Sequence, residues 1–323
     1  MTKLRNQLAA CLTGLLISSA SAARAQFDDV KTSGMRLDKT VVEKIKIGMT
    51  ITAQGGPCNG IVGTVPVPTE WPEQKVQILK EDVSPNVRKV DYRQLTGGTA
   101  KQMLVAVPHL NAGDEAHALV TFEVTRRTIL PPDDKSIFKI AEHPEKEKDA
   151  AIYLGPSPYI ESRNPKIVKL AKEVTDGKEN WDKVEAICDA VRDKIQYKAG
   201  DLKGALKGLN DGTGDCEEYS SLFIAMCRAE NIPARTIWVP SHCYSEFYLV
   251  DDKGKGYWFP CQSAGAKEFG GITETRPILQ KGDNFHDPDR PKERLRYVNE
   301  FLKGSTSKGS GRPSVRFVQE EVK

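Results

Sequence analysis

A cysteine at the predicted start of a helix is the first group in this chain that could do chemistry. Cys216 lies in the segment 214–223, where Asp215 and Glu218 have the Asp-x-x-Glu spacing of a capping box ahead of an apolar helix. This spacing puts Cys216 at the first helical position, where free N–H groups and the positive end of the helix dipole favour a thiolate. The segment predicts either a nucleophile or a cysteine that only happens to begin a helix.

A histidine follows on a predicted strand. His242 begins the segment 242–250, and the period of two along a strand puts His242, Tyr244 and Glu246 on one face and Cys243 on the other. An imidazole can take the proton of a thiol, and the thiolate can then attack a carbonyl carbon to form a thioester. A third polar side chain normally holds the imidazole tautomer. The order of these elements therefore fits thiol–imidazole acyl transfer.

Four segments together resemble the transglutaminase-like superfamily, which shares a papain-like core. The segments are 186–197, 214–219, 231–235 and 242–249. They contain Gly-Asp-Cys, Asn-Ile-Pro-Ala-Arg and His-Cys-Tyr-Ser-Glu in the family's order, with Asn231 in place of a glycine and Tyr244 in place of a tryptophan. The resemblance covers residues 160–265 and implies an α+β papain-like core with Cys216 as nucleophile and His242 as base.

The third catalytic position departs from the family pattern. The family usually reads Trp-x-Pro-x-Asp, and its aspartate orients the histidine. When this chain is aligned on Trp258 and Pro260, that position holds Gln262. A glutamine carbonyl can accept the imidazole N–H, but a neutral side chain stabilises imidazolium less than a carboxylate does. The implied catalytic set is Cys216, His242 and Gln262, with either an altered pH dependence or lost catalysis.

The remaining cysteines of this region have structural interpretations. If His242 faces Gln262 across the hairpin, Cys243 lies opposite Cys261, and both point away from the site at a distance that a disulfide can span. Cys188 lies beside the apolar stripe of a predicted helix and is expected to be buried and inert. A zinc site is disfavoured because no Cys-x-x-Cys spacing is present. No metal or cofactor is predicted.

The chain between residue 26 and residue 132 has the pattern of a β-sandwich-like domain. Short β-branched or alternating runs are separated by turns rich in glycine, proline and asparagine. Several short strands at this spacing are typical of a sandwich. A polar connector is predicted from 133 to 159. The predicted strands include 41–51, 75–79, 103–107 and 118–124.

The composition becomes helical after the connector. Residues 160–280 are predicted to form the transglutaminase-like core, with helices capped by Asn164 and Asn180 ahead of the cysteine helix. The tail 281–323 is predicted to hold a short basic helix at 291–302, a flexible Gly/Ser-rich linker and one terminal strand.

The first 25 residues have the pattern of a secretory signal peptide. Lys3 and Arg5 precede an apolar run, and small residues lead to a cleavage site after Ala25. The segment 8–11 also resembles a lipoprotein box, but almost no hydrophobic region precedes it, which favours a soluble exported protein, periplasmic or extracellular. The run is shorter than the ~20 apolar residues of a spanning helix, so no integral membrane segment is expected in the mature chain.

Composition limits the classes of partner. The chain has 323 residues, 39% of them hydrophobic and 28% charged, which is typical of a globular protein. A net charge of +3 and the lack of a glycine-rich phosphate loop or an Arg/aromatic stripe argue against nucleic acid. The expected partner is a protein or peptide substrate, and the sequence does not determine the oligomeric state.

Three functions remain open at this point. The first is an exported cysteine enzyme that hydrolyses amide bonds through a thioester on Cys216, as a peptidase or amidase. The second is a protein cross-linking transglutaminase, in which a lysine amine accepts the acyl group. The third is a non-catalytic binding module, which the departure at Gln262 favours.

Overall fold

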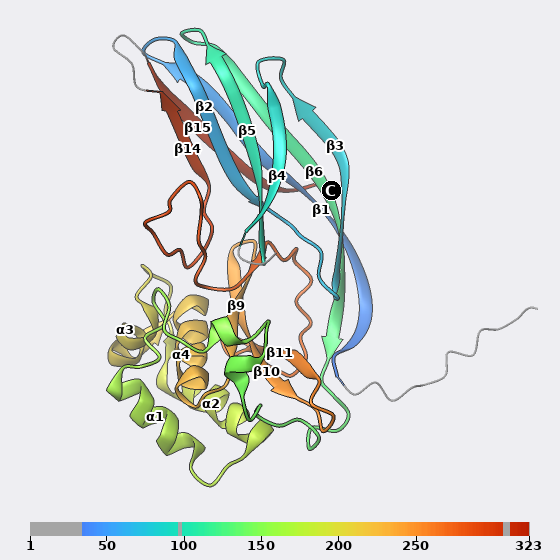
Figure 1. The fold of residues 1–323 in the computed structure, drawn as a ribbon, viewed down its shortest axis with the longest axis vertical. Coiled ribbons are helices and arrows are strands. Elements are labelled where there is room, and N and C mark those ends of the chain that lie inside the picture. The colour runs from blue at the N-terminus through green and yellow to red at the C-terminus, as the bar shows by residue number, and fades with distance from the viewer. Residues whose placement is uncertain (1–33, 96–98, 306–310, 323) are drawn as a thin grey trace, which may run out of the picture. The chain divides into compact units, whose positions relative to one another are not determined.

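The computed structural model describes residues 34–95, 99–305 and 311–322, and these residues form one compact unit (Figure 1). The predicted signal peptide, residues 1–25, lies outside the described residues. Within the described ranges, no helix is long and apolar enough to cross a membrane.

Among the described residues, eight strands build a β-sandwich, which confirms the prediction of a β-rich N-terminal half (Figure 1). One sheet has the order β15-β1-β6-β3, and β14, β2, β5 and β4 are hydrogen-bonded neighbours in a second sheet. Alternate residues of β1, β2, β5 and β6 are buried between the sheets, because the period of two turns every other side chain inward. The strands are β1 Arg36–Gln54, β2 Cys58–Val67, β3 Gln74–Val83, β4 Lys89–Leu95, β5 Ala100–Leu110, β6 Glu115–Leu130, β14 Phe301–Ser305 and β15 Arg312–Val322.

The last residues differ in part from the prediction. The terminal strand is confirmed, since β15 pairs with β1 along its whole length. The basic helix predicted at 291–302 is wrong: these residues form turns and then β14. Tertiary hydrogen bonds replace the helical ones, because Val298 exchanges two with the side chain of Gln280, and Leu295 bridges to Phe285.

The second half has the predicted α+β architecture, with helices against an antiparallel sheet (Figure 1). The connector contains two short 3-10 helices, η2 Pro144–Lys146 and η3 Ala151–Tyr153. The helices are α1 Pro165–Thr175, α2 Asn180–Lys194, α3 Gly204–Asp211 and α4 Cys216–Ala229. The strands are β7 Gln196–Tyr197, β8 Thr213–Gly214, β9 Ala234–Val239, β10 His242–Val250, β11 Gly256–Gln262, β12 Glu268–Phe269 and β13 Gln280–Lys281.

The short strand β13 joins the sandwich to the α+β half. Gln280 pairs with Trp238 of β9 on one side and with Ala100 of β5 on the other. The strands therefore form one sheet of the order β12-β11-β10-β9-β13-β5-β2-β14, with β4 on β5. The domain limits predicted at 132 and 160 remain predictions, since the sheet continues between the two halves.

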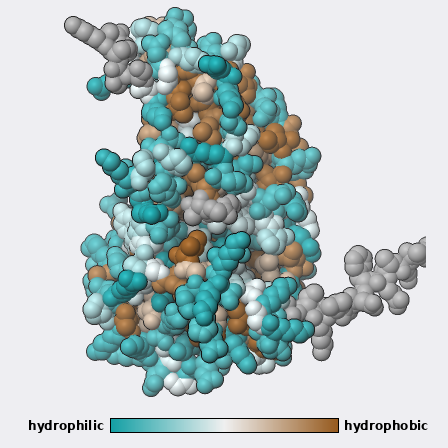
Figure 2. All heavy atoms as spheres, viewed as in Figure 1, coloured by the Kyte–Doolittle hydropathy of each residue, from teal (hydrophilic) through white to brown (hydrophobic). Residues whose placement is uncertain are grey.

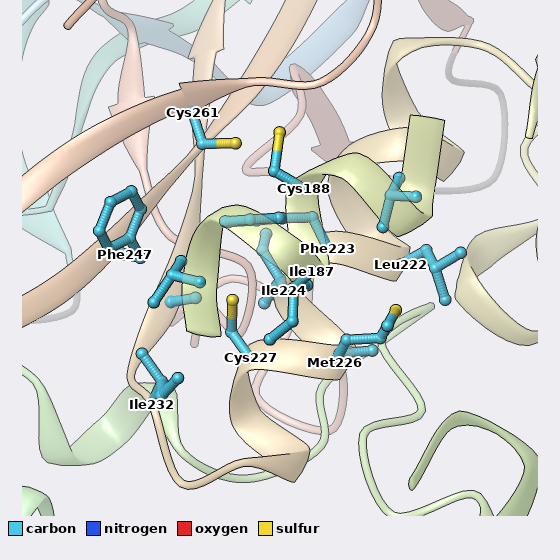
Figure 3. Packing of buried hydrophobic residues seen from close by; sticks show 14 of the residues in the cluster. Ile187, Cys188, Leu222, Phe223, Ile224, Met226, Cys227, Ile232, Phe247 and Cys261 are labelled. Carbon is cyan, nitrogen blue, oxygen red and sulfur yellow. The ribbon is translucent and has the colours of Figure 1, made fainter. Parts of the chain in front are cut away.

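The apolar core of the α+β half lies between α2, α4 and the strands β10 and β11 (Figure 3). Ile187, Phe223 and Phe247 are fully buried there. The helices present their polar sides to solvent, and hydrophilic residues cover most of the lower part of the face in Figure 2. This core fixes α4 against β10, the two elements that carry the cysteine and the histidine.

The two predicted helix caps have different outcomes. Asn164 caps α1 by accepting a hydrogen bond from the N–H of Lys166 at 3.0 Å, as predicted. Asn180 is not the cap of α2, because Glu179 occupies that position. The Asn180 side chain instead accepts from the N–H of Ile140 at 3.0 Å and ties the helix to the connector.

Candidate active site

The start of α4 is the capping box that the sequence predicts, with Cys216 as the first helical residue. Asp215 accepts a hydrogen bond from the N–H of Glu217 at 2.9 Å, and Glu218 accepts from the N–H of Asp215 at 3.1 Å. The other Glu218 oxygen accepts from the N–H of Lys203 at 2.7 Å, which holds α3 against the same turn. The Cys216 N–H belongs to the first turn, where the helix offers it no acceptor, so it can serve an oxyanion.

The structure brings Cys216, His242 and Gln262 together. His242 Nε2 lies 3.0 Å from Gln262 Oε1, and the imidazole also makes a hydrogen bond with the Cys216 side chain. Because Nε2 donates to the glutamine carbonyl, Nδ1 is the ring nitrogen left for the sulfur. Gln262 therefore occupies the orienting position in space as well as in sequence, and the catalytic roles of the three residues remain predictions.

The surroundings of Cys216 favour its thiolate. A hydrogen bond from the Cys243 thiol is the largest cause that lowers the pKa of Cys216, and burial opposes it. Hydrogen bonding and the charge of His242 add to the Cys243 contact, and together they bring the pKa of Cys216 to about 4. Burial works against the charged form of His242, but the hydrogen bond and charge of Cys216 outweigh it and raise the pKa of the imidazole. The pair is therefore a thiolate–imidazolium ion pair.

Two further charge pairs flank the ion pair. The charge of Arg276 lowers the pKa of His242. The Arg276 guanidinium donates a hydrogen bond to the Pro240 carbonyl at 2.9 Å and forms an ion pair with Glu274. On the other side, Arg296 pairs with Glu217 at 2.6 Å. Burial raises the pKa of Glu217, and Arg296 counteracts this effect. Arg276 and Arg296 thus each have a carboxylate partner.

The cross-strand disulfide predicted between Cys243 and Cys261 is wrong, since both are free thiols. The strand register is two residues away from the assumed one, because Cys261 lies opposite Ser245. Cys243 points toward α4, where its sulfur lies 3.8 Å from Ser220 Oγ and contacts Cys216. The register shift removes the Cys243–Cys261 pairing. Cys243 points into the site because α4 covers the face of β10 that carries Cys243, opposite to the face of Tyr244. Sequence reasoning therefore missed Cys243 as a site residue.

Two of the three residues, Cys216 and His242, open onto a cleft of about 800 Å³, whose lining does not include Gln262. Its walls come from segments far apart in the chain, and Cys216 and His242 both line it. Two wall residues have left-handed backbone, Tyr159 with φ 67° and Ser241 with φ 57°. Non-glycine residues in this region cost about 1–3 kcal/mol each, and such strain concentrates at functional sites. Other lining residues are Leu202, Glu217, Trp238, Arg294, Arg296 and Tyr297.

A buried ion cluster supports the strand of His242 from behind. Glu246 accepts from Arg235 at 2.8 Å and from Lys281 at 2.7 Å. Burial disfavours the Glu246 carboxylate, but the two cations outweigh it and lower its pKa. Lys281 also donates to Glu73 of the sandwich half at 2.7 Å. The arginine and glutamate of the family motifs thus hold β9, β10 and β13 together, and Glu246 is unavailable to orient the imidazole.

The two family substitutions noted in the sequence also have physical explanations. Asn231 has φ 60°, a left-handed conformation that asparagine tolerates better than most residues other than glycine. Tyr244, in place of tryptophan, is buried and its hydroxyl accepts from Arg126 at 3.1 Å. Among the described residues, no group of three or more His, Cys, Asp or Glu is placed to hold a metal ion.

Comparison with known proteins supports the family and the fold. Residues 168–263 match the model of the transglutaminase-like superfamily, which confirms the resemblance inferred from the motifs. The fold is similar to that of a candidate cysteine protease from Cytophaga hutchinsonii, with a TM-score of 0.58, 19% identity, and coverage of 90% of this chain and 94% of that one.

A more distant structure is a candidate protease from Parabacteroides distasonis, with a TM-score of 0.27, 11% identity, and coverage of 73% of this chain and 63% of that one. This likeness is too low to add to the description of the fold. No curated protein sequence matches the chain.

Proposed function

We propose that the chain is an exported cysteine enzyme of the transglutaminase-like type, which hydrolyses amide bonds of a protein or peptide through a thioester on Cys216. The observation that carries the proposal is the ion pair of Cys216 and His242, oriented by the hydrogen bond of 3.0 Å from His242 to Gln262. Export rests on the signal-peptide pattern of residues 1–25.

The chemistry follows from the positions of these groups. The Cys216 thiolate attacks the amide carbonyl, and the N–H of Cys216 faces the developing oxyanion. The His242 imidazolium gives its proton to the leaving amine. The neutral imidazole then deprotonates a water molecule, and the resulting hydroxide attacks the thioester carbonyl. The C–S bond breaks, the acid leaves, and the thiolate–imidazolium pair is restored. Gln262 keeps Nδ1 toward the sulfur throughout, because its carbonyl accepts from Nε2.

The geometry favours a catalytic site over a binding module. A neutral Gln262 was the main sequence argument against catalysis, but its carbonyl makes the hydrogen bond that an orienting residue needs. A glutamine also leaves the imidazolium less stabilised than an aspartate would, which eases proton transfer to the leaving amine. The cleft beside Cys216 has room for several residues of an extended substrate.

The test is incubation of the mature protein with a mixed peptide library, followed by mass spectrometry of the products. A library presents many different residues to the cleft in one reaction. We expect new peptide termini or deamidated glutamines with the native protein and none with Cys216→Ala. A primary amine added in a parallel reaction should leave the products unchanged. Amine incorporation in place of hydrolysis would favour a cross-linking transglutaminase, and no product in either reaction would favour the binding module.

A further inference from the structure

A second thiol lies against the nucleophile. The Cys243 side chain donates a hydrogen bond to the Cys216 sulfur, and so does its backbone N–H. Cys216 and Ser220 are one turn apart on the same face of α4, and Cys243 Sγ lies 3.8 Å from Ser220 Oγ. These contacts place the Cys243 sulfur directly under the start of the helix.

The two thiols differ in the properties that matter for oxidation. Cys216 is partly exposed, lines the cleft and is held as a thiolate. Cys243 is 1% exposed, and its hydrogen bond to Cys216 together with burial raises its pKa, so it stays protonated. Cysteines that sense oxidants have this pattern: an accessible thiolate that reacts first, with a resolving thiol beside it.

We propose that Cys243 is the resolving thiol of the site and forms a reversible disulfide with Cys216 when hydrogen peroxide reaches the cleft. The thiolate of Cys216 attacks one peroxide oxygen, the O–O bond breaks, and the distal oxygen leaves as hydroxide, which takes the proton of the His242 imidazolium to become water. Cys216 becomes a sulfenic acid. The Cys243 sulfur then attacks the Cys216 sulfur, the S–O bond breaks, and the Cys243 proton leaves with the hydroxyl as a second water. Two thiols are oxidised and one peroxide is reduced to two waters.

The disulfide would protect the nucleophile while it suspends activity. Without a resolving thiol, a sulfenic acid continues to sulfinic and sulfonic acids, which thiol reductants do not reverse. A disulfide blocks those steps and is reopened by thiol exchange. The proposal rests on the reactive thiolate of the proposed function, but it does not require that the substrate be an amide.

A second buried thiol pair provides the matched control. Cys188 of α2 and Cys261 of β11 have their sulfurs facing one another in the core, and Cys261 hydrogen-bonds to Cys188 (Figure 3). Both are 0% exposed, and burial raises the pKa of Cys261. This pair has proximity without an accessible thiolate. A Cys188→Ser variant therefore reports any oxidation that depends on proximity alone.

The experiment treats the reduced mature protein with hydrogen peroxide and reads the intact mass and the cross-linked peptides. We expect a loss of about 2 Da, a Cys216–Cys243 cross-link, and full recovery of Cys216 alkylation after dithiothreitol. Cys188→Ser should behave in the same way. Cys243→Ser should instead gain about 32 Da or more at Cys216 and recover little alkylation.

Three results would overturn the proposal. The first is irreversible oxidation of Cys216 in the native protein at the rate seen in Cys243→Ser. The second is a disulfide that maps to Cys188 and Cys261 alone. The third is an unchanged mass while Cys216 still reacts with iodoacetamide. Because the readout is mass, a protein that forms this disulfide but hydrolyses no peptide would contradict the proposed function and leave this proposal standing.

Discussion

The pH profile of Cys216 alkylation follows directly from the ion pair. The pKa of Cys216 is about 4, so it is almost wholly thiolate at pH 6. An ordinary thiol, with a pKa of about 8.5, is only about 0.3% thiolate at that pH. A thiolate of low pKa is also less nucleophilic, and a Brønsted slope of about 0.4–0.5 makes Cys216 about 100-fold slower per thiolate.

These two effects set the magnitude that an assay should find. At pH 6 the gain of about 300-fold in thiolate and the loss of about 100-fold in nucleophilicity leave Cys216 only about threefold faster than an ordinary thiol. At pH 5 the advantage grows to about 30-fold, because the thiolate fraction of the ordinary thiol falls tenfold. The diagnostic feature is therefore a rate that stays level from pH 5 to 7, where an ordinary thiol changes tenfold per pH unit.

The assay is iodoacetamide labelling of the native protein between pH 3.5 and 9, with peptide mapping to isolate Cys216. The other described cysteines are buried and serve as internal controls. In His242→Ala the lower limb should move to higher pH by about 1–3 pH units, since a cation beside a thiolate lowers its pKa by that amount. A native rate that climbs tenfold per pH unit from 5 to 8, or a profile unchanged in His242→Ala, would refute the ion pair.

Three further predictions concern the supports of the site. In Gln262→Asp the ion pair should persist to higher pH than in the native protein, because a carboxylate raises the pKa of the imidazole. The alkaline limb of the pH–activity profile measures this pKa, so that limb should move to higher pH. An unmoved limb would contradict the orienting role of residue 262. Glu246→Ala should lower the free energy of unfolding by about 3–5 kcal/mol in urea titrations, because Arg235 and Lys281 lose their buried carboxylate partner. A loss of less than about 1 kcal/mol would show that this ion cluster does not hold β10 in place. Asn231→Ala should lower the free energy of unfolding by about 1 kcal/mol in the same titration, because the φ of residue 231 is 60° and alanine is strained there. Asn231→Gly should leave the free energy of unfolding almost unchanged, because glycine adopts this φ without strain. Equal losses in the two variants would show that backbone strain does not explain the choice of asparagine.

The sequence was sufficient for features that depend on local spacing or on the family motifs. The capping box, the position of Cys216 in α4 and the meeting of Cys216, His242 and Gln262 needed only the order of motifs and the helical and strand periods. The alternating runs of the sandwich follow from the same periods. Each of these features is set by residues close together in the chain or by a pattern shared with relatives.

Features that depend on long-range packing were missed. The hairpin register is two residues from the expected one, and this changed the partner of Cys261 from Cys243 to Ser245. The predicted basic helix is replaced by tertiary hydrogen bonds such as those of Val298 with Gln280. The Cys243–Cys216 contact depends on which sheet face α4 covers, and no local pattern in the sequence states that.

The central claim is that an acyl group passes through Cys216, and an acid-quenched reaction tests it most directly. The mature protein is mixed with the peptide library for seconds, quenched in acid to preserve a thioester, and analysed by intact mass and peptide mapping. We predict an acyl adduct on Cys216 in the native protein and none in Cys216→Ala. Products that form with no adduct on Cys216, or that form equally in Cys216→Ala, would contradict the claim.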